Sequence, residues 1–314
     1  MNFSTRLSLQ FSFLYSPYVE MPRVSARNVG MQAWHDSEEF SAIRETLLNV
    51  LPIFEGKDTL TLVAPCNLGG VLAVAHLEAA CIDAGIPYRR KFLAGDDNLQ
   101  FNPAILVQDS EGIPSSIFKD GCLRLNPMEM EFDLGSSGLR RNGVIEEVCQ
   151  SAILASMVAS NGALVKRLRP WALAGSWLRN TMDNAFDAQY SRIKDLLSQE
   201  GTIRLVPMVE VEDCDLLSLS GISESLLQRM KRHWPKMDLA QRSSAMSDLM
   251  LPALEADSPS TARIEELGWL RVLSADWNSD MATMLGRIQR DWPKDGLGVH
   301  CARLVDQLLS TGKL

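Results

Sequence analysis

The residues best placed for chemistry form a short turn, Asn67-Leu68-Gly69-Gly70, between an apolar run and a run of small residues. A glycine-rich turn at a helix N-terminus exposes backbone amides, which can bind an anion such as phosphate. The turn is not a P-loop, because no Gly-Lys-Ser/Thr follows it, and it lacks the GxGxxG spacing. Two interpretations stay open: the four residues bind a phosphate or other ligand, or they form a tight strand-to-helix turn in which glycine allows close packing.

Asp109 is the second candidate, because it follows the apolar run Ala104–Val107 at the expected carboxyl end of a strand. Parallel sheets present functional residues at that end. The aspartate could be a metal ligand, a helix cap or a loop residue. A single carboxylate cannot hold two divalent ions, since each hard cation needs several oxygen ligands. The sequence offers no Ser–His–Asp set, Cys–His pair or spaced carboxylate pair beside it.

Hydrophobic periodicity predicts the elements that position these candidates. We expect a helix over residues 37–51, capped by Asp36 or Ser37, and a helix over residues 70–84 that Gly85 ends. The expected strands are residues 60–64, Tyr88–Leu93, Ala104–Val107 and Cys122–Leu125. Alternating strands and helices indicate an α/β fold with a parallel sheet flanked by helices.

The later part of the chain is mainly helical by the same criterion. We expect helices over residues 144–160, 171–182 and 185–197, and a short strand over residues 203–209. The predicted organisation is a leader over residues 1–30 (disordered, or the product of a misassigned start), an α/β domain over residues 31–200 and a helical region over residues 201–314.

The helical region contains an internal duplication. Residues 227–239 recur 58 positions later as residues 285–297, with seven of 13 positions identical. Each copy predicts a helix ending at Trp-Pro, a turn and a second helix, and the copies extend over about 217–256 and 274–314. The duplicated segment contains arginines and tryptophans that could form an interaction face: Arg229, Arg232, Trp234, Arg287, Arg290 and Trp292. The alternative, which is the commoner arrangement, is that the tryptophans are packed and the arginines are solvated.

Composition limits the partners. The net charge of −8 argues against a broad phosphate-binding surface, so we expect weak or no direct binding of nucleic acid. The six cysteines form no CxxC pair, which is typical of reduced thiols in a cytoplasmic protein rather than of a disulfide framework or zinc site. No apolar run reaches 18 residues, so we expect no membrane span.

Residues 58–200 resemble the DHH phosphoesterase superfamily, in particular its archaeal RecJ-like branch. The segment 65–70, Pro-Cys-Asn-Leu-Gly-Gly, stands where that superfamily has His-Pro-Asp-x-Asp-Gly. An Ala-rich helix, the turn Ala-Gly-Ile-Pro at 84–87 and the strand Arg-Lys-Phe-Leu at 90–93 follow in the same order. The resemblance covers less than half of the chain.

The metal-binding positions of the superfamily are altered in this chain. Asn67 and Gly69 replace the two aspartates of the turn, whereas Asp109 corresponds to the next metal-binding aspartate. Arg179 replaces the aspartate of the later Ala-x-x-Gly-x-x-Gly-Asp motif, and no Asp-His-His triplet precedes Asn126. The resemblance therefore implies a degenerate metal site, no catalytic residue and no cofactor, with Mn or Mg only if activity remains.

The resemblance also implies a function. An inactive relative, cell division cycle protein forty-five, is a subunit of the eukaryotic CMG helicase, where it lies beside GINS and the MCM ring. The leading hypothesis is therefore a non-catalytic scaffold subunit of an archaeal DNA replication or repair complex, with GINS- or MCM-type protein partners, in the cytoplasm at the nucleoid. Two alternatives remain: a divergent metal-dependent phosphoesterase or single-strand nuclease that uses Asp109 with Asp96 or Asp97, and a nucleotide-sensing module.

Overall fold

A five-stranded sheet forms the centre of the α/β part. The computed structural model describes residues 34, 40–93, 102–108, 116–133, 140–179, 187–216, 219–255 and 259–314. The strands are β1 (Leu60–Pro65), β2 (Tyr88–Leu93), β3 (Ala104–Val107), β4 (Ile117–Lys119) and β5 (Cys122–Leu125), in the order β2-β1-β3-β5-β4. All neighbouring pairs are parallel except β4–β5. The predicted α/β class with a parallel sheet is thereby confirmed.

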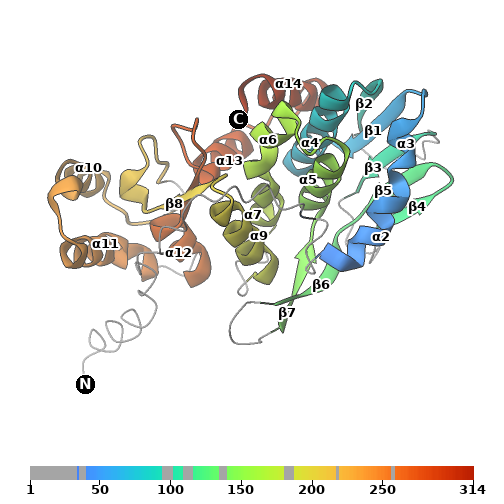
Figure 1. Cartoon of the computed structure of the whole chain (residues 1–314). Helices are drawn as coiled ribbons and strands as arrows, with labels where there is room; N and C mark the ends of the chain where they lie inside the picture. The colour runs from blue at the N-terminus through green and yellow to red at the C-terminus, as the bar shows by residue number, and fades with distance from the viewer. Residues whose placement is uncertain are drawn as a thin grey trace. The chain divides into compact units, whose positions relative to one another are not determined.

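Helices cover the centre of this sheet, where strands β1 and β3 are apolar. Five of the six residues of β1 are buried, as is typical of a parallel strand that is packed on both faces. Helix α4 (Leu68–Ala84) packs against β1 and β2, and α5 (Glu147–Val158) lies beside it (Figure 1). The helix pair α2 (Ser41–Val50) and α3 (Pro52–Glu55) precedes β1, and α2 contacts β4.

Helix α4 ends where the sequence predicts, but it begins at Leu68 and not at residue 70 as predicted. The side chain of Asn67 caps its N-terminus, and Gly85 follows its last residue with φ 70°, the left-handed conformation that glycine adopts without strain. The predicted start of α2 differs, because Phe40 precedes the helix without a side-chain cap. The proposed caps Asp36 and Ser37 lie outside the described residues.

A β-hairpin replaces part of a predicted helix. Strand β7 (Arg140–Ile145) pairs antiparallel with β6 (Met128–Asp133), so that Val144 and Ile145 belong to a strand. The prediction of a helix from residue 144 was therefore wrong, and α5 begins at Glu147. The physical reason is that these two β-branched residues pair with β6 before the chain turns into the helix.

The next segments are shorter than predicted. The predicted helix over residues 171–182 is a 3₁₀ turn, η3 (Arg169–Leu173), continued by α7 (Ala174–Leu178), and α6 (Ala163–Leu168) precedes them. Helix α9 (Ala188–Gln199) matches the next predicted helix. The predicted strand over 203–209 is only β8 (Arg204–Val206), which pairs with β9 (Arg271–Leu273), and η4 (Met208–Glu210) follows it.

The duplicated segment forms two helix pairs. The first pair is α10 (Glu224–His233) and α11 (Leu239–Leu254), joined by η5 (Trp234–Lys236); the second is α13 (Met281–Arg290) and α14 (Leu297–Thr311), with α12 (Thr261–Trp269) between the two copies. Helix α14 packs against α4 and β2, whereas α10 and α11 lie away from the sheet (Figure 1).

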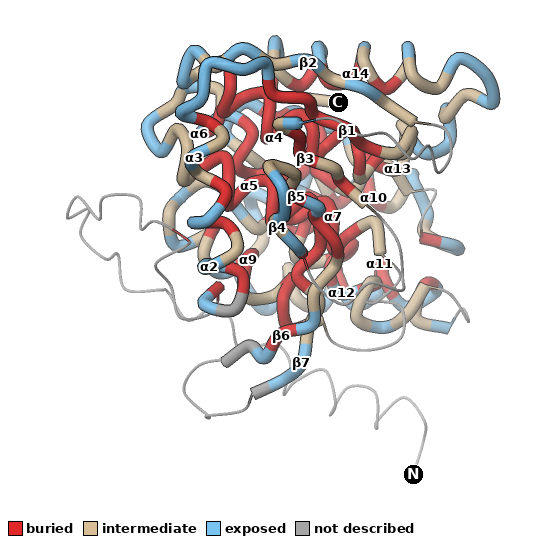
Figure 2. The backbone as a smooth tube through the Cα atoms, turned by 90° about the vertical axis from the view of Figure 1, so that its right-hand side faces the viewer, coloured by how far each residue is buried: buried red, intermediate tan, exposed pale blue. Residues whose placement is uncertain are grey.

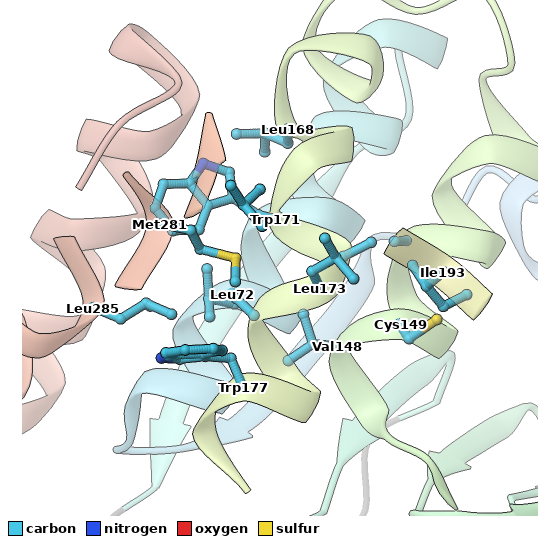
Figure 3. Close-up of a cluster of buried hydrophobic side chains, with 14 of the residues drawn as sticks. Leu72, Val148, Cys149, Leu168, Trp171, Leu173, Trp177, Ile193, Met281 and Leu285 are labelled. Carbon is cyan, nitrogen blue, oxygen red and sulfur yellow. The ribbon is translucent and has the colours of Figure 1, made fainter. Parts of the chain in front are cut away.

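One hydrophobic core connects the α/β part with the helical part. Buried positions run along β1 and β3 and through α4 and α5 (Figure 2). Trp171 and Trp177 pack near Leu72 of α4 and near Met281 and Leu285 of α13 (Figure 3). The described residues belong to one compact unit, Ala33–Leu314, and the predicted leader lies outside them. No described helix has the length and apolar character to cross a membrane.

Candidate functional site

The glycine turn is shaped by close packing of its own backbone. Asn67 Oδ1 accepts a hydrogen bond from the Gly70 amide at 2.7 Å, which uses the asparagine side chain as the cap of α4. A Cβ at Gly70 would lie 2.3 Å from the carbonyl oxygen of Pro65, so only glycine fits there. Leu68 is buried. These contacts account for the turn without a ligand.

Two acidic residues that the sequence analysis did not select lie at the start of α5. Glu146 Oε2 accepts hydrogen bonds from the amides of Val148 at 2.6 Å and Cys149 at 3.0 Å, so Glu146 caps the helix. Glu146 is fully buried, and its loss of water, followed by the nearby charge of Glu147, raises its pKa to about 8. Burial therefore favours the protonated, uncharged form of this carboxyl group.

Glu147 lies between two of the positions where the resemblance expects metal ligands. A Cβ at Gly69 would be 3.2 Å from Glu147 Oε1, and Arg179 Nη1 is 3.7 Å from Glu147 Oε2. The side chain of Glu147 is 7% exposed and that of Arg179 is 22% exposed. The structure thus brings Gly69 and Arg179 together around one carboxylate, which is paired with a guanidinium, and Asn67 Oδ1 would lie 3.6 Å from the same Cβ at Gly69.

The α7 helix closes this site from the other side. A Cβ at Gly175 would meet Glu146 Oε2 at 2.0 Å, so α7 approaches the first turn of α5 at backbone distance. Next to it, the buried Ser176 hydroxyl donates to Gln189 Oε1 of α9 at 2.5 Å. Glycine at position 175 is therefore what allows α5 and α7 to meet.

The described residues do not fit a divalent cation. Mn²⁺ and Mg²⁺ need several oxygen ligands, but Glu146 accepts hydrogen bonds from the amides of Val148 and Cys149, and Arg179 already supplies a positive charge beside Glu147. Within the described part of the chain, no group of three or more His, Cys, Asp or Glu residues could hold a metal ion. Asp109, like Asp96 and Asp97, lies outside the described residues, so its predicted role stays a prediction.

The six residues of the predicted interaction face are placed at two locations. On the first copy, Trp234 is buried and its indole donates to Glu210 Oε1 at 2.8 Å, while Arg229 and Arg232 are exposed on α10. On the second copy, Arg287 binds Asp213 and Arg290 binds Asp215. Trp292 is half-buried and packs edge-on against His300, with ring centroids 5.0 Å apart.

The sequence contained a signal for the acidic residues that were missed. Glu146 and Glu147 directly follow the β-branched pair Val144-Ile145, an arrangement typical of a strand that ends at a capped helix. Because the whole run was assigned to one apolar helix, neither acid was given a role. Nothing local in the sequence indicates that Arg179 meets Glu147.

Comparisons with known proteins find a similar fold but no protein that is related in sequence. No protein-family model matches the chain, and no curated protein matches it in sequence. Among solved structures, the crystal structure of CDC45 from Entamoeba histolytica matches with a TM-score of 0.50 and 10% sequence identity, over 87% of this chain and 69% of that chain. At this identity the match concerns the fold: the chain has a CDC45-like α/β architecture.

Proposed function

We propose that this protein is a non-catalytic scaffold subunit of a DNA replication or repair assembly. The observation that carries the proposal is the Arg179–Glu147 ion pair beside Gly69, in the place where the resemblance expects carboxylates around a metal. A guanidinium at that place neutralises the carboxylate and repels a divalent cation. The replication context is supported by the CDC45-like fold, and partners of the GINS or MCM type are the expected ones.

Metal binding tests the first half of the proposal. Purified wild-type protein should show no saturable Mn²⁺ binding by isothermal titration calorimetry, and no Mn²⁺-dependent cleavage of single-stranded DNA. The triple variant Asn67→Asp, Gly69→Asp, Arg179→Asp surrounds Glu147 with three further carboxylates and should acquire Mn²⁺ binding, which serves as the positive control. Cleavage by the wild type that Asp109→Ala abolishes would establish an enzyme and overturn the proposal.

Partner capture tests the second half. The tagged full chain should recover replication components from a native extract of its source cells, identified by mass spectrometry. The capture should be repeated at high salt, which separates specific complexes from proteins bound non-specifically through charge, because exposed charge contacts weaken with ionic strength. A capture without helicase, GINS-type or polymerase components would count against a replication role, even if the protein proved inactive.

A further inference from the structure

The two copies of the duplication each carry two arginines one helical turn apart. They are Arg229 and Arg232 on α10, and Arg287 and Arg290 on α13. The surroundings are equivalent in space as well as in sequence. The buried Leu227 and Leu285 correspond, and the side chain at the same place on the second helix packs on each tryptophan: Arg242 on Trp234, with its guanidinium carbon 5.1 Å from the ring centroid, and His300 on Trp292.

The second copy shows what such an arginine pair binds. Arg287 holds Asp213 with two hydrogen bonds of 2.6 and 2.7 Å, and Arg290 Nη2 lies 2.5 Å from Asp215 Oδ2. The two carboxylates are two residues apart in a segment outside helices and strands, and the two arginines are three apart on a helix. Side chains at i and i+3 on a helix are about 5–6 Å apart, similar to the span of two residues in an extended segment. The pair therefore matches an Asp-x-Asp segment in spacing and charge.

The first copy presents the same pair to solvent. Both Arg229 and Arg232 are exposed, and neither makes an ion pair with a carboxylate in the part of the chain that the structure describes. Among the described residues, Arg232 donates to the backbone of its own helix, from Nε to the Gln228 carbonyl at 3.3 Å. Arg229 and Arg232 therefore have the spacing of the second pair, but no carboxylate of the described residues binds them.

The acidic segment of this chain does not reach the open pair. Residues 210–216 pass between the two copies, and α10 contacts them through a different side chain, Lys231, whose Nζ donates to the carbonyls of Val211 at 2.6 Å and Glu212 at 3.0 Å. Arg287 and Arg290 hold the carboxylates of the same segment from α13. Within the described ranges, the second copy consequently uses its arginines inside the chain, whereas the first copy leaves Arg229 and Arg232 without a carboxylate partner.

We propose that Arg229 and Arg232 bind an acidic Asp-x-Asp segment of a partner protein. A carboxylate ligand is favoured over nucleic-acid phosphate because the equivalent pair already binds carboxylates, and because the chain carries a net charge of −8. The inference deepens the proposed function by naming the chemistry of one partner, and it concerns a helix that contributes nothing to the Glu147 site.

A peptide-binding experiment tests this surface directly. The probe is a fluorescein-labelled peptide with the sequence of residues 210–216 and serine in place of Cys214, and its binding to the purified full chain is followed by fluorescence anisotropy. The double variant Arg229→Ala, Arg232→Ala should weaken binding about tenfold. Replacing both with lysine should give an intermediate loss, because lysine keeps the charge without the bidentate geometry.

The controls separate this site from general electrostatics. Lys294→Ala, Arg303→Ala removes the same charge from two other exposed positions and should leave the affinity unchanged. A peptide with asparagine at the two aspartate positions should not bind. Equal binding of the acidic peptide to the wild type and the Arg229/Arg232 double alanine variant, or no binding to either, overturns the inference, and so does tighter arginine-dependent binding of a single-stranded oligonucleotide. None of these results bears on metal binding or on partner capture, so failure here is distinct from failure of the proposed function.

Discussion

Glu146 and Gly175 meet where α5 and α7 come closest, and a Cβ at Gly175 would lie 2.0 Å from Glu146 Oε2. We predict that Gly175→Ala lowers the free energy of unfolding by about 2–4 kcal/mol. The reason is that Glu146 cannot move aside without losing its hydrogen bonds to the amides of Val148 and Cys149. Urea unfolding followed by circular dichroism measures the loss.

Gly298→Ala is the matched control. No atom would lie within 4 Å of a Cβ at Gly298, which is in the first turn of α14. Alanine there should leave stability unchanged or raise it by up to about 1 kcal/mol, because it restricts the unfolded chain. Equal losses for the two variants would show that the contact with Glu146 is not the cause.

His76 should make the protein acid-sensitive. The side chain is fully buried on α4, and its loss of water, followed by the charge of Arg169, lowers its pKa to about 3. Since the unfolded chain titrates near 6.5, the unfolded state binds the proton first, and stability falls as the pH drops from 6.5 toward 3 by at most about 1.4 kcal/mol per unit. In urea unfolding, the free energy of unfolding of the His76→Leu variant should decrease less between pH 6.5 and 5 than that of the wild type. The same slope in both proteins would contradict this prediction.

Glu146 should make the protein less stable as the pH rises, the opposite of the effect of His76. The pKa of Glu146 is raised in the folded state. Its contribution to the free energy of unfolding is therefore fully present below the ordinary carboxyl pKa of 4.5, and it is lost as the pH rises toward about 8. His76 is mostly neutral in both states above pH 7, so its contribution between pH 7 and 8 is small. Between those values wild-type stability should decline relative to Glu146→Gln. Glu78, whose pKa burial raises to about 7, makes Glu78→Gln the comparison that separates the two acids.

The strands and the helix around the turn at residues 67–70 could be predicted because the sequence patterns that indicate them lie within each element. The strands Tyr88–Leu93, Ala104–Val107 and Cys122–Leu125 have the predicted bounds, and Gly85 ends α4 as expected. The hairpin β6–β7 was missed although Met128 to Phe132 alternate between apolar and acidic residues, the period of a strand. The apolar residues 144 and 145 were assigned to the apolar helix that follows, although Glu146 and Glu147 stand between them and mark the boundary.

The site could be predicted only in part for a different reason. Asn67 and Gly69 were selected because they form a turn within the chain, and Arg179 was selected by the resemblance. The partner that joins them, Glu147, is 32 residues from Arg179 and 78 from Gly69 in sequence. Such proximity follows from how α4, α5 and α7 pack, and no local pattern records it.

A double-mutant cycle on Asp213 and Arg287 measures how strongly an arginine of the second copy binds its carboxylate. Hydrogen bonds from Arg287, then from Ser279, lower the pKa of Asp213 to about 2. Its stabilising contribution is therefore present above pH 3.8 and is lost as the pH falls toward 2. Because the side chains are 41% and 52% exposed, we expect a coupling of only about 0.5–1 kcal/mol at neutral pH, from Asp213→Asn, Arg287→Met and the double variant. A coupling of zero would mean that the bidentate geometry adds nothing.

The position of α14 has a consequence for how the chain is made. Arg90 of β2 donates to the Ala302 carbonyl at 3.3 Å across 212 residues of sequence, and the Gly312 carbonyl accepts from the indoles of both Trp171 and Trp277. At about 5–20 residues per second, β2 leaves the ribosome roughly 10–40 s before the helix that covers it. During that interval the nascent chain exposes the apolar surface of α4 that α14 will bury. Chaperone binding to the growing chain should therefore persist until α14 is synthesised.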